Sequence, residues 1–154
     1  MAAIRVPKSE LINQKGRNFE PSPWVLLDQA RINTFADCTE DHQFIHIDQE
    51  KAAQTPFGGT IAHGFLTLSM LSKLCEESGV LPDNLVMGIN YGLNKVRFLA
   101  PVRAGKRVRA HMVVADVEQK DEARFLITQS ISVEIEGEET PALVAEWLTM
   151  VVAG

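Results

Sequence analysis

The feature that most limits the possible folds is an alternation of apolar and polar residues late in the chain. Between residues 124 and 136, apolar side chains occupy mainly the odd-numbered positions and polar side chains mainly the even-numbered ones. Because successive side chains of a β-strand point to opposite faces, this pattern predicts a strand with one buried and one solvated face. Residues 108–117 and 142–152 read as companion strands, joined to it by turn signals at 120–122 and 136–138.

An earlier segment, from Ala62 to about Ser78, has the period of a helix. Its large apolar residues recur at spacings of three, four and seven, and Gly79 stands where a glycine often ends a helix. A helix of about 16 residues spans ~24 Å. Because it is apolar on more than one face, we expect it to be largely buried and wrapped by something wider than another helix. The sequence therefore predicts an α+β fold, with an antiparallel sheet wrapped around a long central helix.

Shorter elements are expected in the first half of the chain. Residues 1–23 are polar and turn-prone, and we interpret them as an N-terminal arm with a short helix. Asp28 is a candidate N-cap for the helix that follows it. Residues 41–48 are expected to form a turn or loop, and Asp48 to cap a second short helix over residues 49–54. The chain has 154 residues, which predicts one domain over residues 1–154.

The charge balance limits the partners. The formal net charge is -5 and the pI is about 5.4, which argues against nucleic acid, because a nucleic-acid surface needs clustered Lys and Arg. Basic residues do gather between residues 95 and 109, and they are either solvated strand edges or a patch for a small phosphorylated ligand. They are Lys95, Arg97, Arg103, Lys106, Arg107 and Arg109.

The expected location is the cytoplasm. Cys38 and Cys75 are the only cysteines, and their spacing fits neither a metal site nor a disulfide framework. The N-terminal residues lack the apolar core of a signal peptide, and no run approaches the ~18 apolar residues of a membrane span. We therefore expect a cytoplasmic protein with no membrane partner.

The residues that carry chemistry lie between Asp41 and Gly64. Asp41 and His46 are five residues apart, and the segment TPFGGTIAHG that follows has three glycines, which let the backbone approach a ligand closely. A carboxylate and an imidazole have intrinsic pKa values of about 3.9 and about 6.5, so together they can hold a water and share its proton transfers. A helix that begins at His63-Gly64 directs free backbone N–H groups at whatever they act upon.

Linked motifs in this region resemble the MaoC-like branch of the hot-dog superfamily, and within it the (R)-specific enoyl-CoA hydratases and the nodulation-protein-N-like subgroup. DHQFIHID, residues 41–48, has the Asp and the His at that family's spacing. PFGGTIAHGFLTLSML, residues 56–71, resembles the start of the central helix, and residues 90–105 resemble the strand after it. The resemblance extends from about Trp24 to the end of the chain. The commonest hydratase form has Gly, Asn and Pro where this chain has Glu40, Gln43 and Phe44.

The resemblance implies a hot-dog domain that forms a homodimer, with an acyl-CoA tunnel at the subunit interface. It implies reversible hydration of a trans-2-enoyl-CoA to an (R)-3-hydroxyacyl-CoA, with no metal or redox cofactor, and with CoA as part of the substrate. Asp41 and His46 are the implied catalytic pair, and the backbone N–H of Gly64 is the implied oxyanion donor. The substrate-binding candidates are Gln43, His63, Asn90, Tyr91, Arg103 and Lys106.

Other polar residues near the pair are expected to be structural. His42 is predicted to be exposed, and His63 to fix the loop or cap the helix rather than to transfer protons. A metal site built from His42, His46 and Asp48 matches no common ligand spacing. The serines of the predicted helix lack the context of a nucleophile elbow, which argues against covalent acyl transfer.

Two other functions stay open. Hot-dog thioesterases often have an acidic residue near the start of the central helix, whereas Glu76 and Glu77 come at its far end in this chain. A non-catalytic acyl-CoA-binding or partner subunit would keep the fold without turnover, and the presence of both Asp41 and His46 argues against it.

Overall fold

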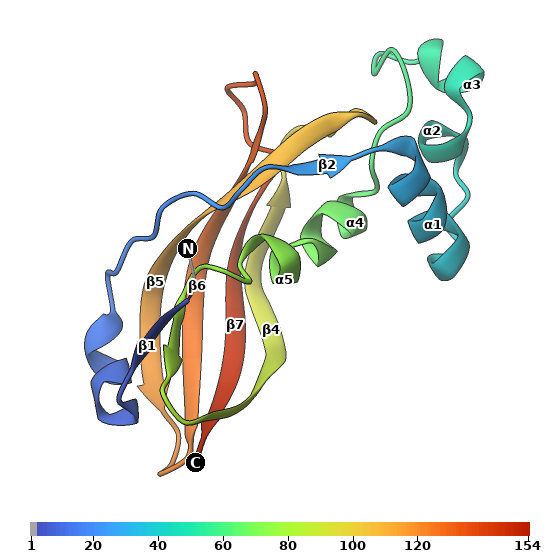
Figure 1. The fold of residues 1–154 in the computed structure, drawn as a ribbon. Coiled ribbons are helices and arrows are strands. Elements are labelled where there is room, and N and C mark those ends of the chain that lie inside the picture. Colours follow the sequence, from blue (N-terminus) through green and yellow to red (C-terminus); the bar gives the residue numbers. More distant parts are fainter. Residues whose placement is uncertain (1–2) are drawn as a thin grey trace.

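The structure, a computed structural model, describes residues 3–154; residues 1 and 2, the start of the expected arm, lie outside the described residues. Its main element is a curled five-stranded sheet in the order β2-β5-β6-β7-β4, antiparallel throughout (Figure 1). Helices α4 and α5 lie against the sheet, and α1 to α3 project beyond one end of it (Figure 1). The strands are β2 (Val25–Leu27), β4 (Leu85–Phe98), β5 (Lys106–Gln119), β6 (Arg124–Ile135) and β7 (Leu143–Ala153).

The alternating residues form the buried face of the sheet, as predicted. Phe125, Ile127 and Ile131 on β6 are at most 2% exposed. Ile131 lies opposite Met112 on β5 and Ala145 on β7, and both of these are also buried. The inward residues of three adjacent strands therefore form one continuous apolar layer, which confirms the α+β prediction.

Three short helices follow β2: α1 (Gln29–Thr39), α2 (Phe44–Ile47) and α3 (Gln49–Ala53). Both predicted caps are confirmed: Asp28 accepts a hydrogen bond from the Arg31 N–H at 2.9 Å, and Asp48 accepts one from the Lys51 N–H at 3.0 Å. The expectation of an irregular segment at 41–48 was wrong for its second half. There the Asp48 N–H donates to the Phe44 carbonyl at 2.9 Å and closes the turn of α2.

The single helix predicted over residues 62–78 was wrong in length and continuity. It is two short helices, α4 (Gly64–Ser69) and α5 (Leu71–Leu74), separated at Met70. The Ser69 hydroxyl donates to the Phe65 carbonyl at 2.7 Å, a bond from a side chain to the preceding turn that bends helices. Gly79 does not end the helix. It has a positive φ of 105° and turns the chain into β3 (Val80–Pro82).

Burial of this helical segment is one-sided. Leu66, Leu71 and Leu74 are at most 4% exposed, whereas Phe65 is 69% exposed. The prediction of a largely buried helix was therefore wrong for the single chain, in which one side of the helical segment is exposed. The sheet covers only the side of α4 and α5 that faces it.

The N-terminal segment contains the expected short helix, and it packs against the sheet. β1 (Ile4–Val6) pairs in parallel with β3, and the 3-10 helix η1 (Lys8–Gln14) follows. Leu11 of η1 is fully buried in a cluster with Val114 and Phe125. η1 and β1 therefore cover a part of the sheet that α5 does not reach (Figure 1).

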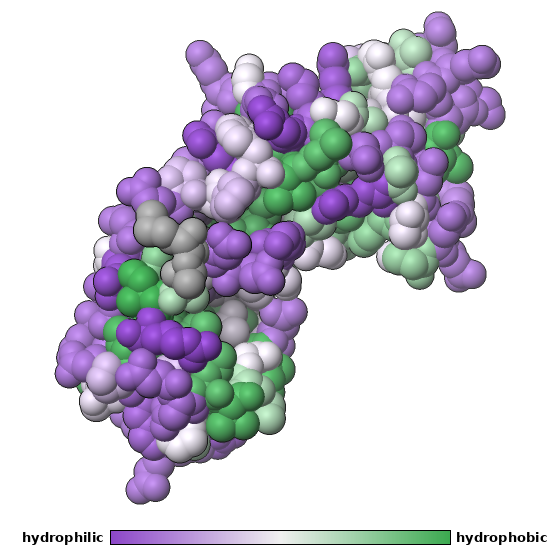
Figure 2. Space-filling model, viewed as in Figure 1, coloured by the Kyte–Doolittle hydropathy of each residue, from purple (hydrophilic) through white to green (hydrophobic). Residues whose placement is uncertain are grey.

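The edge strand β4 exposes apolar side chains on both of its faces. Five of them are 42–60% exposed: Val86, Met87, Ile89, Tyr91 and Leu93. Figure 2 shows apolar side chains at the surface over the lower part of the sheet, where Figure 1 shows β3 and β4. Within residues 3–154, no helix has the length and apolar character needed to cross a bilayer.

Candidate active site

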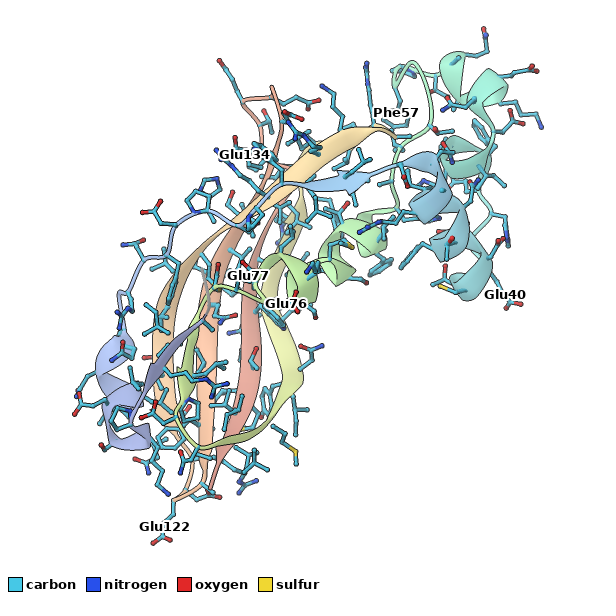
Figure 3. All side chains as sticks on the ribbon, viewed as in Figure 1. Glu40, Phe57, Glu76, Glu77, Glu122 and Glu134 are labelled. Carbon is cyan, nitrogen blue, oxygen red and sulfur yellow. The ribbon has the colours of Figure 1, made fainter. Side chains whose placement is uncertain are left out.

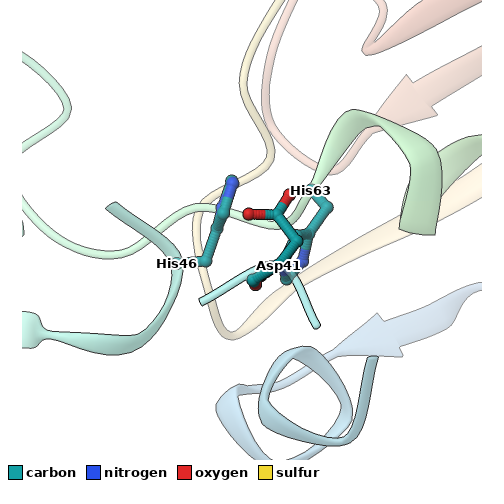
Figure 4. Close-up of side chains that lie close together, drawn as sticks. All are labelled: Asp41, His46 and His63. Carbon is teal, nitrogen blue, oxygen red and sulfur yellow. The ribbon is translucent and has the colours of Figure 1, made fainter. Parts of the chain in front are cut away.

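Asp41, His46 and His63 converge where the α1–α3 group meets the start of α4 (Figure 4). Asp41 lies in the loop after α1, His46 lies in α2, and His63 directly precedes α4. One ligand-type atom from each side chain lies within 4.8 Å of the other two. The structure therefore brings the predicted catalytic pair together and adds a second imidazole to it.

The first residue of α1 ties this region together. The Gln29 amide donates to the His46 carbonyl at 2.7 Å, and its oxygen accepts from the Thr60 hydroxyl at 2.5 Å. At the other end of α1, Glu40 has a left-handed φ of 61° and turns the chain toward Asp41. Such a conformation costs a non-glycine residue free energy, which gives a physical reason for the glycine that the hydratases most often have there.

His46 is held by a hydrogen bond at one of its two ring nitrogens. Its side chain is buried, and Nδ1 lies 2.8 Å from the Ile61 carbonyl oxygen. Because a carbonyl oxygen only accepts hydrogen bonds, Nδ1 carries the proton in the neutral ring and Nε2 keeps its lone pair. Burial lowers the pKa of His46 from its ordinary value, and the Ile61 carbonyl and the Asp41 charge oppose this shift.

Asp41 is in a contrasting environment. It is exposed, and its carboxylate has one long contact, 3.4 Å from the Gln43 N–H. Its backbone carbonyl is held more firmly, at 3.0 Å from Nε2 of His63. A solvated carboxylate beside a buried neutral imidazole gives two groups with different proton affinities at one place, as acid–base chemistry requires.

His63 packs directly on His46. The two rings are stacked, with centroids 3.8 Å apart and planes 24° apart. The ring of Phe35 also contacts His63, at 4.9 Å between centroids. His63 is only 2% exposed, and its Nδ1 has no hydrogen-bond partner among residues 3–154. This buried histidine contacts the loop of Asp41 through the Asp41 carbonyl and makes no side-chain cap bond to α4.

The three side chains are placed less well for a metal ion than for proton transfer. A tetrahedral ion needs imidazole lone pairs that converge on one point. The rings of His46 and His63 are stacked with planes 24° apart, so their in-plane lone pairs lie in nearly parallel planes and do not converge readily on one ion. These three residues differ from the metal ligands considered from the sequence, which were His42, His46 and Asp48. His42 is exposed, as predicted, and pairs with Asp37 at 2.9 Å.

Gly64 opens α4 beside a mainly apolar cavity of about 260 Å³ that also borders His46, Phe57 and Phe98. A Cβ at residue 64 would lie 3.1 Å from two atoms of the Phe98 ring. Glycine is therefore needed for close packing of the α4 N-terminus against the end of β4. The backbone N–H of Gly64 is at the first position of the helix, where no partner within the helix exists.

Two of the predicted substrate contacts lie beside residues of the site, although neither lines the cavity. Gln43 directly precedes α2, and its N–H is the one that faces the Asp41 carboxylate. Arg103 forms an isolated bridge with Ile61, and its guanidinium makes no hydrogen bond or ion pair with residues 3–154. Lys106 is partly engaged, because its ammonium lies 3.9 Å from Glu138.

Asn90 and Tyr91 lie apart from this cluster, on the edge strand β4. Asn90 borders a different hollow of about 270 Å³, and its oxygen accepts from the indole N–H of Trp147 at 3.2 Å. Tyr91 is 60% exposed. One chain therefore does not bring these two candidates to Asp41 and His46.

Most of the basic residues between 95 and 109 are paired with glutamates of neighbouring strands. Arg109 contacts Glu134 at 2.6 Å, Lys95 contacts Glu146 at 3.5 Å, and Arg107 forms a bidentate pair with Glu136. These pairs favour the interpretation as solvated strand edges. Arg97 instead donates to the Val96 carbonyl at 2.8 Å. Arg103, whose guanidinium has no partner among residues 3–154, keeps a phosphate contact open.

Several residues that shape the site were missed from the sequence. The Ile61 carbonyl orients His46, Gln29 anchors α2, and Phe35 packs on His63. Backbone carbonyls and contacts between distant segments leave no pattern in one sequence. The signals that pointed to this place were the spacing between Asp41 and His46 and the helix start at His63-Gly64 that follows it.

Comparison with known proteins identifies the family. The family described as "MaoC like domain" matches residues 11–135. Nodulation protein N of Rhizobium leguminosarum bv. viciae is 46% identical over 137 residues, which are 88% of this chain and 85% of that protein. 3-Hydroxyacyl-thioester dehydratase Z of Mycobacterium tuberculosis is 46% identical over 145 residues, or 94% of this chain and 95% of that one.

A solved structure, described as the (R)-hydratase from A. caviae involved in PHA biosynthesis, has the same fold. It superposes with a TM-score of 0.71 at 24% identity and covers 88% of this chain and 94% of that one. The hot-dog prediction is thereby confirmed. The expected boundary at Trp24 was wrong, because the family match begins at residue 11, where Leu11 of η1 is part of the core. The chain belongs to the MaoC-like dehydratase family.

Proposed function

We propose that this hydro-lyase adds water reversibly to a trans-2-enoyl-CoA and gives the (R)-3-hydroxyacyl-CoA. The observation that carries the proposal is the free Nε2 of neutral His46 beside the Asp41 carboxylate, next to the cavity that Gly64 borders. The names of the dehydratase relative and of the (R)-hydratase support a hydroxyacyl thioester and this handedness.

The proposed reaction needs two proton transfers and one site for developing charge. A water held by Asp41 and His46 loses one proton to the pair while its oxygen forms a bond to C3 of the substrate. The C2–C3 π electrons move toward the thioester, and its oxygen gains negative charge. The pair then returns a proton to C2, so that one water is added in total. Because two coupled groups share the proton, the two transfers need not belong to separate residues.

Gly64 is the proposed donor to the thioester oxygen. α4 has only six residues, so the proposal rests on an aligned, unpaired N–H rather than on the dipole of a long helix. The apolar lining of the cavity, which includes the half-exposed ring of Phe98, should lower the local dielectric around this hydrogen bond and so strengthen it.

The choice of CoA as carrier is supported by Arg103, whose guanidinium has no hydrogen-bond or ion-pair partner among residues 3–154 and lies near Gly58, in the loop that precedes α4. An Arg103→Ala, Lys106→Ala double variant should raise KM for CoA thioesters without changing kcat, and Arg103→Ala alone should account for most of the change. Lys120→Ala is the matched control, since Lys120 is paired with Glu118 in the turn between β5 and β6. An unchanged KM in the double variant would remove both residues from the substrate site.

We also propose a homodimer in which β4 of one protomer pairs with β4 of its partner. β4 is an edge strand with apolar side chains exposed on both faces, and such an edge is a template for pairing. The chain of 17.0 kDa should therefore sediment with twice that mass. Ile89→Lys should give monomers, whereas Val144→Lys, at an exposed apolar site on β7, should not. A monomeric wild type would contradict the dimer.

A cytoplasmic location stays a prediction. It is supported by Cys38 and Cys75, which are both free thiols and need no oxidising compartment.

The alternative functions have less support. Glu76 and Glu77 lie after α5, beside the sheet and at the far end from Gly64 (Figure 3), so they are poorly placed to direct water as in a thioesterase. The test is the loss of enoyl-thioester absorbance with crotonyl-CoA and a medium-chain 2-enoyl-CoA, with parallel measurement of free thiol. Hydration without thiol release supports the proposal. Thiol release alone would favour hydrolysis, and tight acyl-CoA binding without either reaction would favour a binding subunit.

A further inference from the structure

We propose that His63 is a positioning residue that holds Asp41 and His46 in their reactive arrangement, through one hydrogen bond to the Asp41 backbone and one ring stack on His46. This inference rests on the proposed function, because the arrangement matters only if that pair transfers protons. His63 itself need not touch the substrate, so this role differs from the substrate-binding role for which the sequence made it a candidate.

The hydrogen bond fixes a segment that has little else to hold it. Asp41 is exposed, follows Glu40 in a left-handed conformation, and has only a 3.4 Å contact through its carboxylate. The Nε2–H of His63 donates to its carbonyl at 3.0 Å across 22 residues of chain. Because this bond joins the backbone and leaves the carboxylate free, it sets the position of Asp41 without using its reactive atoms.

The ring stack completes the orientation of His46. A single hydrogen bond from Nδ1 to the Ile61 carbonyl fixes where the ring lies but lets it tilt about the bond axis. The ring of His63, stacked at 3.8 Å between centroids, limits that tilt. Together the two contacts define the direction of the free Nε2 lone pair, which a proton transfer requires.

The burial of His63 has a cost that core packing alone does not explain. The side chain is 2% exposed, and its Nδ1 has no partner among residues 3–154. A buried unpaired nitrogen lowers stability, and an apolar ring of similar shape would avoid that loss. An apolar ring could stack on His46, but it could not donate the hydrogen bond to the Asp41 carbonyl.

The pKa of His46 provides a measurement that a histidine with a purely structural role would not change. The charges that act on His46 are those of His63 and Asp41: His63 lowers the pKa of His46, and Asp41 raises it. Removing the second imidazole should therefore raise the pKa of His46. The acid limb of kcat/KM should then move to higher pH.

The experiment compares two variants that separate the two contacts. His63→Gln keeps an amide N–H near the position of Nε2 and loses the stacked ring, whereas His63→Phe keeps the ring and loses the donor. His42→Gln is the matched control, because His42 is exposed and, among residues 3–154, pairs with Asp37 alone. The wild type is assayed first with crotonyl-CoA, and NMR titration of the His46 ring in wild type and His63→Gln provides a readout without turnover.

We expect kcat to fall at least tenfold in His63→Phe with a smaller change in KM, and a smaller fall in kcat in His63→Gln. Both variants should shift the acid limb to higher pH, and His42→Gln should match the wild type. If the wild type hydrates substrate while both His63 variants keep its kcat, its acid limb and its His46 titration, the positioning role is refuted. If the wild type hydrates no enoyl-CoA, the proposed function fails instead, and the NMR titration still tests the influence of His63 on His46.

Discussion

The sharpest test of the oxyanion proposal is a side chain at residue 64. A Cβ there would approach two ring atoms of Phe98 to 3.1 Å, whereas ordinary contacts lie at 3.4–4 Å. The ring or the start of α4 must therefore shift by a few tenths of an ångström. Loss of one oxyanion donor costs ~3 to 4 kcal/mol in the transition state, a decrease in kcat of about 10²- to 10³-fold. We expect Gly64→Val to approach that loss and Gly64→Ala to lower kcat by at least tenfold.

A second substitution identifies the cause. Phe98→Leu removes the part of the ring that the new Cβ meets, so Gly64→Ala, Phe98→Leu should recover part of the kcat that Gly64→Ala loses. Phe98→Leu alone controls for the change in the cavity wall. Steady-state hydration of crotonyl-CoA gives kcat and KM, and thermal unfolding verifies that each variant is folded. A folded Gly64→Val variant with near-normal kcat would refute the role of this N–H.

Three further predictions follow from burial and protonation. Because burial lowers the pKa of His46 from its ordinary 6.5, kcat/KM should be at its plateau at pH 7 and should fall on acidification. The unfolded chain binds this proton at higher pH than the folded chain does. The free energy of unfolding, measured with urea, should therefore also fall below pH 6.5. Burial raises the pKa of the Cys75 thiol to about 12, whereas Cys38 is exposed. A disulfide reagent should therefore modify one thiol in the native chain and two in denaturant. Rapid modification of both thiols in the native chain would contradict the burial of Cys75. Phe125→Ala, at a residue 1% exposed, should lower the free energy of unfolding by ~3–5 kcal/mol, and a loss below about 1 kcal/mol would show that this ring is not a core residue.

The sheet was predictable because its signal is local. In β6 each inward residue is two positions from the next, so one strand displays its own buried face in the sequence. The N-caps Asp28 and Asp48 were predictable for the same reason, since each bonds an N–H three residues later. None of these features depends on a distant segment.

The central helix was predicted less well because its ends depend on distant contacts. The sequence has no glycine or proline between Leu74 and Gly79 to stop the helix, but the chain leaves the helix after Leu74 and forms β3, whose partner β1 lies near the N-terminus. Complete burial was also overestimated, because periodicity shows that Phe65 is apolar and not whether one chain covers it. Sequence periodicity reports local pattern, and these outcomes were set by tertiary pairing.

The candidate site divides in the same way. Asp41 and His46 were found through their spacing, while their supports come from residues 15 to 22 positions away, the Ile61 carbonyl and the His63 ring. The assignment of the pair stays a prediction. The geometry supplies the reason to test it, because it shows an exposed carboxylate close to a buried imidazole that borders a cavity.

The most direct test of the central claim compares the wild type with Asp41→Asn and His46→Gln in the hydration of crotonyl-CoA and a medium-chain 2-enoyl-CoA. Hydration is followed as loss of enoyl-thioester absorbance, and the handedness of the product is determined. Acid–base groups contribute about 10²- to 10⁴-fold to such rates. The proposed mechanism predicts an (R)-3-hydroxyacyl-CoA from the wild type and a fall in kcat of that order in each folded variant. Wild-type hydration that persists in both variants would contradict the mechanism, and an (S)-product would contradict the proposed geometry of water addition.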